Sequence, residues 1–257
     1  MTVTNEALTG KLASVTGAGI GRAAAVAFAR GGARVALVDR SPDGLGETAR
    51  LIEEAGGQAL ALACDVTSED DVQSALDGTV QAFERLDVAF NNAGIEQPVK
   101  PAADIAKDEW DRVIGVSLTG MFLCMKYQIP TDAPAGGRCD RQRLVRRQCQ
   151  GLQGTAGLRR GQARRHRPDR SAAFGYAALN VRVKAVCLGI IETEMIRRFA
   201  ESTPGGRDAL IADEPIGRLG TPEETAAAVL RLCSDAAFFT TGHARSSTVA
   251  QPSDSGS

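Results

Sequence analysis

The chain has 257 residues, of which 43% are hydrophobic, and a formal net charge of −1 at pH 7, so it is long enough for one α/β domain with a full core. Its first residues are polar and no run of about 18 apolar residues occurs, so we expect neither a signal peptide nor a membrane span, and we expect a cytoplasmic protein. Six cysteines without Cys-x-x-Cys spacing and only two histidines argue against a metal site and against a disulfide framework.

The first predicted element is a strand that runs through a glycine turn into a helix. An apolar run ends at Thr16, the turn spans residues 17–21 (Gly-Ala-Gly-Ile-Gly), and an alanine-rich helical run covers residues 23–30. Glycine tolerates positive φ and lets the backbone approach a phosphate, while a helix N-terminus offers free N–H groups. The spacing Gly19-x-Gly21-x-x-Ala24 fits a dinucleotide-binding fingerprint. Glycine-rich helix starts also serve close packing alone, so this stretch leaves both interpretations open.

Strand and helix patterns then alternate along the chain. Apolar runs of strand length cover residues 34–39, 58–64 and 86–90, and helical patterns cover residues 41–55 and 68–85. This alternation predicts a parallel sheet with helices on both faces and a ligand at the carboxyl edge of the strands. We therefore predict a single α/β domain over residues 1–257, with a Rossmann-type, doubly wound parallel sheet in three α/β/α layers.

The second half continues the pattern with less regularity. Residues 107–128 read as one long helix, whose apolar stripe should pack against another helix. Residues 181–187 have the β-branched composition of a strand, and a helical stretch starts at Thr193. The sequence Thr221-Pro222-Glu223-Glu224 is a capping box with proline at the first helical position, which predicts a helix to about residue 235.

An arginine-rich block interrupts this pattern. Residues 138–170 contain 11 arginines, no lysine and two aspartates, a composition typical of nucleic-acid contact or of a solvated tail. We expect no nucleic-acid partner, because the block lies inside a globular pattern. It lacks the β-branched run of a buried strand, and burying unpaired guanidinium groups is costly. We therefore expect residues 131–170 to be irregular or exposed.

Polar residues follow three of the predicted strands. Asp39 ends the second strand 18 residues after Gly21, where a carboxylate can accept both ribose hydroxyls and repel a 2′-phosphate. This favours NAD over NADP, although Arg40 leaves NADP open and Asp39 could instead serve a turn. Asp65-Val66 follows the third strand and residues 91–94 (Asn-Asn-Ala-Gly) follow the fourth. Each of these could meet a cofactor or only stabilise its own turn.

Together these motifs resemble those of the short-chain dehydrogenase/reductase family. The resemblance spans about residues 10–242 and includes Leu188-Gly189-x-x-x-Thr193-x-Met195. It implies a seven-stranded Rossmann sheet, hydride transfer between NAD(H) and a small alcohol or ketone, no membrane partner, and a homo-oligomer (dimer or tetramer). It also implies that pyrophosphate meets Gly17, Gly19, Ile20 and Gly21, ribose meets Asp39, and adenine meets Asp65 and Val66. The other cofactor-binding residues that it implies are Arg40, Asn92, Ala93, Gly94, Ile191 and, at the carboxamide, Thr193.

The sequence departs from the family pattern where catalysis would occur. The glycine turn is two residues shorter than the family's, and Ser117 stands in place of the active-site asparagine. The family's serine, tyrosine and lysine positions fall at Val145, Leu158 and Gln162, whose side chains cannot carry protons. Tyr127 lies on the long helix, and Tyr176 has no lysine at the required helical step, so no neighbouring cation is expected to activate its phenol as a base. We therefore expect an impaired dehydrogenase.

A shifted reading frame explains the loss of these residues. When residues 137–147 are back-translated and read from the second base of each codon, they permit Gly-Gly-Ala-Ile-Val-Asn-x-Ser-Ser. Residues 158–169 permit Tyr-Ala-Ala-Ala-Lys-His-Gly-Val-Ile-Gly-Leu, which restores the family's serine, tyrosine and lysine at their own spacing. A different shift turns residues 245–250 into x-Val-Val-Asp-Gly-Gly. We interpret residues ~131–170 and ~245–257 as frame-shifted translation.

Two other functions stay open. A non-catalytic dinucleotide-binding or partner-binding protein would carry the arginine block as a true insert. A Rossmann methyltransferase would explain residues 19–21 and Asp39, but not residues 91–94 or Thr193. Turnover of an alcohol with NAD, or binding of an adenosyl-sulfonium donor, would separate these functions.

Overall fold

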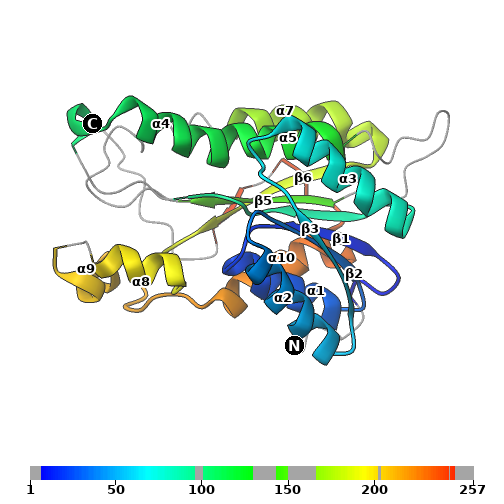
Figure 1. Cartoon of the computed structure of the whole chain (residues 1–257), viewed down its shortest axis with the longest axis horizontal. Coiled ribbons are helices and arrows are strands. Elements are labelled where there is room, and N and C mark those ends of the chain that lie inside the picture. The colour runs from blue at the N-terminus through cyan, green and yellow to red at the C-terminus, as the bar shows by residue number, and fades with distance from the viewer. Residues whose placement is uncertain are drawn as a thin grey trace.

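The computed structural model describes residues 7–95, 101–129, 143–149, 166–201, 204–242 and 244–246. Within them, seven parallel strands form one sheet in the order β3-β2-β1-β4-β5-β6-β7 (Figure 1). The direction of strand addition reverses between β1 and β4, and a doubly wound sheet opens a crevice at such a switch point. The strands are β1 (Leu12–Thr16), β2 (Arg34–Asp39), β3 (Gln58–Ala63), β4 (Val88–Asn91), β5 (Arg143–Cys149), β6 (Arg182–Leu188) and β7 (Ala244–Ser246).

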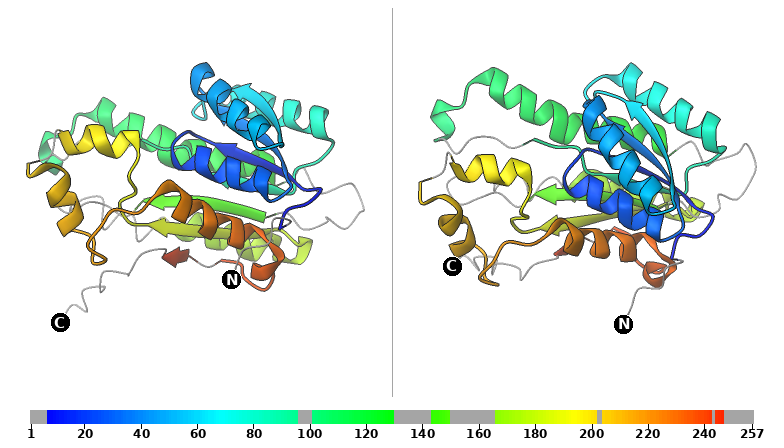
Figure 2. Two further views of the ribbon diagram at one scale, coloured as in Figure 1. Left: turned by 90° about the horizontal axis from the view of Figure 1, so that it is seen from below. Right: turned by 60° about the horizontal axis from the view of Figure 1, so that its bottom comes forward.

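Helices cover both faces of the sheet, which confirms the predicted Rossmann-type α/β/α fold. One face carries α1 (Ile20–Arg30), α2 (Pro42–Glu54) and α10 (Pro222–Cys233) (Figure 1). The other face carries α3 (Glu69–Phe83), α4 (Lys107–Ile114), α5 (Met121–Gln128) and α7 (His166–Tyr176). Two further helices, α8 (Glu194–Glu201) and α9 (Gly206–Ala212), lie at the same end of the molecule as α4 (Figures 1 and 2). Across the described residues, none of the helices combines the length and the apolar character needed to cross a bilayer.

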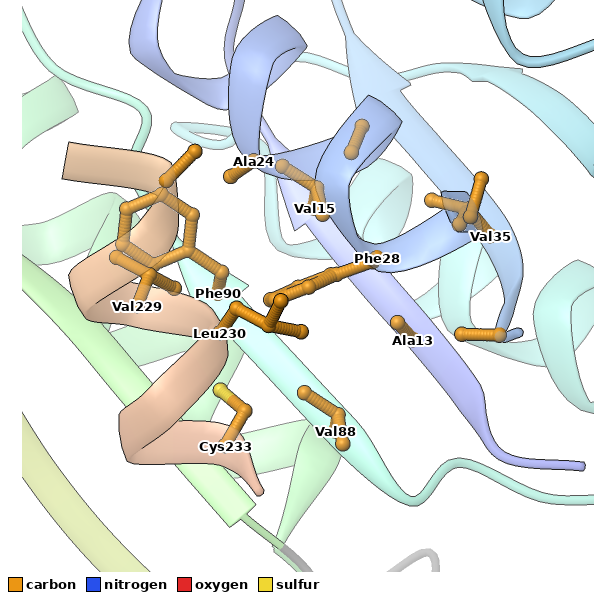
Figure 3. Close-up of a cluster of buried hydrophobic side chains, with 14 of the residues drawn as sticks. Ala13, Val15, Ala24, Phe28, Val35, Val88, Phe90, Val229, Leu230 and Cys233 are labelled. Atoms are coloured by element: carbon orange, nitrogen blue, oxygen red, sulfur yellow. The ribbon is translucent and has the colours of Figure 1, made fainter. Parts of the chain in front are cut away.

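The largest core cluster lies where α1 and α10 pack on β1 and β4 (Figure 3). Phe28 of α1 and Phe90 of β4 are fully buried, and Val229 and Leu230 of α10 belong to the same cluster. Burying each large side chain of this kind contributes about 1.5–3 kcal/mol. Successive strand residues point to opposite faces, and Ala89 accordingly joins the cluster on the other face. The packing of Phe28 therefore holds α1 with its N-terminus at the switch point.

The long helix predicted over residues 107–128 is present, but its middle is π-helical. The segment Gly115–Gly120 separates α4 from α5. Gly120 lies against the end of β3, since a Cβ built on it would be 2.7 Å from Val66 Cγ2. Wide turns of this kind are frequent near functional sites, and this one carries Ser117.

Met121 and Met125 of the predicted apolar stripe are buried against the sheet and α3, whereas Trp110 and Phe122 of the same stripe are exposed. The prediction that this stripe packs on another helix is therefore confirmed only in part.

The expectation that residues 131–170 are irregular is wrong for residues 143–149. They form β5, which pairs in parallel with both β4 and β6. The cause is backbone hydrogen bonding, because β4 and β6 would otherwise leave their facing N–H and C=O groups unpaired, and an extended chain between them satisfies both edges. The expectation is also wrong for residues 166–170, which begin α7. Residues 131–142 and 150–165 lie outside the described residues. Near the second proposed shift, residues 244–246 form β7 beside β6, and residues 247–257 lie outside the described ranges.

Candidate functional site

A cleft of about 300 Å³ opens at the carboxyl edge of the sheet, beside the switch point. Its walls come from the ends of β1 to β4 and from the helices α4 and α8. Of the predicted cofactor-binding residues, Gly21 and Ile191 are the two that do not line it. The lining consists of residues 17–20, 38–40, 64–66, 92–95 and 193–195 together with Arg112, Val116 and Arg198.

The glycine turn joins β1 to α1 at the centre of this cleft. Gly17 and Gly19 have φ angles of +82° and +63°, which glycine adopts without strain. A Cβ on Gly17 would lie 3.0 Å from the Ala93 Cα, so the turn packs directly on the loop after β4. Within the described residues, the N–H groups of Ala18, Gly19 and Ile20 donate to no other group, and the first turn of α1 has no acidic residue. Three donors at a helix N-terminus therefore remain for an anion.

Thr16 and Asn92 hold the glycine turn against the loop after β4. Thr16 Oγ1 accepts hydrogen bonds from the N–H groups of Asn92 and Ala93, each at 3.0 Å. Asn92 Nδ2 donates to the Thr16 carbonyl at 3.1 Å. The Oδ1 atom of Asn92 is buried and has no partner among the described residues. This acceptor is therefore able to take a hydrogen bond from a bound molecule.

Two carboxylates line the cleft at the ends of β2 and β3. Asp39 Oδ1 accepts the Ser41 N–H at 2.8 Å, so Asp39 does serve a turn, while Oδ2 has no partner within the described residues. Asp65 Oδ1 accepts the N–H and the hydroxyl of Thr67 at 2.9 and 2.7 Å. These two bonds, helped by the charge of Arg40, hold the pKa of Asp65 below its ordinary value. Asp65 is therefore ionised at neutral pH.

Ser117, which stands where the family has its asparagine, contacts the loop after β4. Its Oγ accepts the Ile95 N–H at 3.3 Å and donates to the Ile95 carbonyl at 3.4 Å. A Cβ built on Gly94 would lie 3.6 Å from that Oγ. Ser117 itself does not line the cleft. Its hydroxyl thus positions the loop that forms one wall.

The loop after β6 brings Thr193 next to the glycine turn. A Cβ built on Gly19 would lie 3.6 Å from Thr193 Cγ2, and Thr193 Oγ1 accepts the Ile196 N–H at 3.3 Å at the start of α8. Ile191, two residues earlier, is buried and forms a β-bridge with Gly220. The structure therefore brings Thr193 to the cleft and places the Ile191 side chain in the core.

Neither tyrosine lies at the cleft. Tyr176 ends α7 next to the start of β6, at the opposite edge of the sheet. Tyr127 donates to Glu69 at 2.6 Å, and this bond raises the pKa of its phenol, which is the wrong direction for a base at neutral pH. Of the positions where the family has its catalytic side chains, Val145 lies on β5, and Leu158 and Gln162 fall outside the described residues.

Sequence reasoning missed the charged residues that α4 and α8 contribute to the cleft. Ile196 and Phe199 are buried in a cluster with residues of α9, which sets the rotation of α8 so that Arg198 lines the cleft. The helical spacing of Ile196 and Phe199 was the sequence signal that could have predicted which face of α8 carries Arg198. Arg112 reaches the cleft from α4, and no feature of the sequence distinguished it from the other charges of that helix.

The chain is similar to known proteins in both sequence and structure. Residues 15–246 match the family model described as enoyl-(acyl carrier protein) reductase. The chain is 36% identical over 239 residues to cis-4-hydroxycyclohexanecarboxylate dehydrogenase of Sinomonas cyclohexanicum, covering 92% of this chain and 94% of that protein. It is 35% identical over 240 residues to 2,5-dichloro-2,5-cyclohexadiene-1,4-diol dehydrogenase of Sphingobium indicum, covering 91% and 94%. The crystal structure of 3-ketoacyl-(acyl-carrier-protein) reductase from Brucella melitensis complexed with NADH matches with a TM-score of 0.84 and 30% identity, covering 93% of this chain and 97% of that chain.

Proposed function

The chain belongs to the short-chain dehydrogenase/reductase family, and on this premise we propose that it binds NAD(H) in the cleft and interconverts a cyclic alcohol and its ketone only weakly. Two relatives are named as dehydrogenases of ring alcohols, which supports a cyclic substrate. One solved relative is a complex with NADH, which supports a nicotinamide cofactor. The observation that carries the proposal is the glycine turn at the switch point, with its three free amide donors.

The described residues fit a dinucleotide. The free N–H groups of Ala18, Gly19 and Ile20, with the positive end of the α1 dipole, would hold the pyrophosphate. When bound, NAD supplies the nicotinamide ring that takes or gives the hydride. The turn is two residues shorter than the family's, so fewer donors reach the pyrophosphate, and each charge-assisted bond lost costs roughly 1.5–3 kcal/mol. We expect NADH binding weaker than about 1 μM.

Asp39 is the reason to propose NAD rather than NADP. Its free Oδ2 at the end of β2 can accept a ribose hydroxyl, while its charge repels the 2′-phosphate of NADP. Arg40 also lines the cleft beside Asp39, and its positive charge would offset part of this repulsion.

Acid–base catalysis is the part of the reaction that this chain does not support. In the family, a tyrosinate takes the hydroxyl proton, a lysine lowers the pKa of that tyrosine, and a serine orients the oxygen. Here Val145, Leu158 and Gln162 occupy those positions. General acid–base catalysis contributes about 10²–10⁴-fold to rate, and we expect this chain to be slower by a factor of that order than a version with its frame restored between Pro130 and Ser171.

Two measurements test the proposal. Calorimetric titration with NADH tests cofactor binding, and a protein that gives no binding heat up to about 1 mM NADH would contradict it. Oxidation of cyclohexanol with NAD, measured for this chain and for the frame-restored version, tests catalysis. The masses of peptides between Tyr127 and Tyr176 establish which sequence the assayed protein has. Equal turnover by the two versions would overturn our account of the active site.

A second candidate function is favoured by the placement of both tyrosines away from the cleft. A non-catalytic dinucleotide-binding or partner-binding protein would bind NADH without turnover, and the protein made by its natural source would contain the arginine-rich peptides. Peptides of the restored frame in that source would exclude this candidate.

We also propose a homo-oligomer, either a dimer or a tetramer, in the cytoplasm. Trp110 and Phe122 on the long helix are 41% and 55% exposed, which supports burial of that helix against a second copy. The cysteines whose side chains the structure describes, Cys64, Cys124, Cys187 and Cys233, are free thiols, which accords with a reducing compartment. Light scattering measures the assembly, and a monomer at micromolar concentration would contradict this part of the proposal.

A further inference from the structure

A buried carboxylate lies in the chain segment between α9 and α10, outside the cleft. Glu214 is 7% exposed and does not line the cleft. Its Oε1 atom accepts a hydrogen bond from the N–H of Ile190, the second residue after β6. Within the described residues, no lysine or arginine forms an ion pair with Glu214. Its contact with the loop after β6 is therefore a bond to the backbone.

Glu214 lies beside an apolar cluster formed by α8, α9 and the loop after β6. Its partner Ile190 belongs to this cluster, whose other buried members are Ile196, Phe199, Leu210 and Leu219. Burying a carboxylate next to apolar side chains lowers stability unless hydrogen bonds offset the lost hydration. Glu214 has one such bond within the described residues, so stability alone does not account for its carboxylate.

The segment that carries Glu214 holds the loop after β6 at a second place. The Gly220 N–H donates to the Ile190 carbonyl at 2.9 Å, and the Glu192 N–H donates to the Gly220 carbonyl at 2.8 Å. A Cβ built on Gly220 would lie 2.6 Å from Ile191 Cδ1, so the two segments are in direct contact. Both backbone polar groups of Ile190 are therefore bound by residues 214–220, and Glu214 supplies the bond to the N–H.

The loop held in this way leads directly into the cleft. Thr193 begins α8, since its Oγ1 accepts the Ile196 N–H at 3.3 Å, and residues 193–195 line the cleft. Thr193 also lies beside Gly19 of the glycine turn. In the sheet, β6 is on the opposite side of the switch point from β2 and β3, whose ends carry the two aspartates of the cleft. Residues 193–195 therefore approach the glycine turn from the side away from those aspartates.

We propose that Glu214 is a positioning residue for the nicotinamide end of the bound cofactor. The inference rests on the proposed function, because it assumes that NADH binds in the cleft. A dinucleotide with its pyrophosphate at the glycine turn and its adenosine toward Asp39 extends its nicotinamide half to the other side of the switch point. The loop after β6 lies on that side, and Glu214 acts through the Ile190 N–H to hold Thr193 in place there. The adenosine end depends instead on the ends of β2 and β3.

The test compares NADH with ADP-ribose, which has the adenosine and the pyrophosphate but no nicotinamide ring. Glu214→Met removes the acceptor and keeps the length of the side chain. Calorimetry should then show about tenfold weaker NADH binding, with the affinity for ADP-ribose unchanged. Glu214→Gln keeps an oxygen that can accept the Ile190 N–H, and it should retain the parent affinity for both ligands. The control Asp208→Ala removes an exposed carboxylate of α9 and should change neither affinity.

A further variant separates the position of the acceptor from its charge. Glu214→Asp keeps the carboxylate but is shorter by one methylene group, so its oxygen should no longer reach the Ile190 N–H. It should show the same selective loss of NADH affinity as Glu214→Met, and it decides the question if the methionine variant does not fold.

The other outcomes contradict the inference or the function on which it rests. An equal loss of NADH and ADP-ribose affinity in Glu214→Met or Glu214→Asp would mean that Glu214 supports the whole cleft, which overturns the inference. It is also overturned if these variants keep the parent affinity for NADH, or if Glu214→Gln binds NADH as weakly as Glu214→Met does. In each of these cases NADH binding by the parent leaves the proposed function standing. If the parent does not bind NADH, the proposed function fails first, and the inference falls with it.

Discussion

Replacing Thr16 with valine should destabilise the protein at the point where the glycine turn meets the loop after β4. Thr16 is buried, and its Oγ1 accepts the N–H groups of Asn92 and Ala93 at 3.0 Å. Valine keeps the volume but leaves both donors without an acceptor. A buried donor without a partner costs about 1–3 kcal/mol, and the Ala93 N–H is only partly buried. We therefore expect the free energy of unfolding to fall by about 2–4 kcal/mol.

Urea unfolding followed by circular dichroism measures this loss, and Thr16→Ser is the matched control. Serine keeps the hydroxyl acceptor and removes one methyl group, so its loss should stay near ~0.8 kcal/mol. The same bonds hold Gly17 against the neighbouring loop, and Thr16→Val should also weaken NADH binding more than the serine variant does. If the valine variant unfolds at the urea concentration of the serine variant, the two hydrogen bonds do not hold this edge of the sheet.

Three further predictions concern the cofactor, the long helix and the last helix. Asp39→Ala should raise the affinity for NADPH relative to NADH, because the repulsion of the 2′-phosphate disappears; an unchanged ratio in paired titrations would refute this role. Gly120→Ala should destabilise the fold by about 1–3 kcal/mol, since its Cβ would lie 2.7 Å from Val66 Cγ2, and a melting temperature equal to that of the parent would contradict the close approach. The hydrogen bond from Arg218, with that from the Thr221 N–H, lowers the pKa of Glu224 from 4.5 to about 2, so its stabilising contribution is complete above pH 4.5 and is lost as the pH falls toward 2. Glu224→Gln, which does not titrate, should lose less stability over that window in a series of urea curves, and parallel losses would count against the assignment.

The N-terminal half of the fold could be predicted from sequence because each element there carries its own local signal. Ser41 Oγ accepts the Gly44 N–H and Ser68 Oγ accepts the Asp71 N–H, each at 3.2 Å, so α2 and α3 begin where the helical patterns over residues 41–55 and 68–85 start. The capping box at Thr221 forms as well. Helix caps of this kind join residues three positions apart, so the local sequence predicts them without knowledge of the rest of the fold.

The features that were missed have causes far away in the chain. β5 carries three arginines in seven residues, and it is a strand because β4 and β6 present open backbone edges on either side of it. The π-helical turn lies where Gly120 meets Val66, more than 50 residues earlier. The bonds between Thr16 and Asn92 join residues 76 positions apart. None of these partners can be identified from the local pattern, so strand pairing and contact had to come from the structure.

The difference between structure set by backbone hydrogen bonds and chemistry carried by side chains explains why we expect cofactor binding and catalysis to be separable in this protein. Apart from Ile191 and Thr193, the residues that we propose to bind the cofactor lie between Leu12 and Gly94, before the arginine block. Catalysis in the family depends on three side chains whose positions fall within that block. A strand can be specified by its neighbours' backbone, whatever its side chains, but an acid–base group cannot. On our proposal, a frame shift limited to residues ~131–170 removes the side chains for proton transfer and leaves β5 paired in the sheet; we therefore predict a folded protein that binds NADH without turnover.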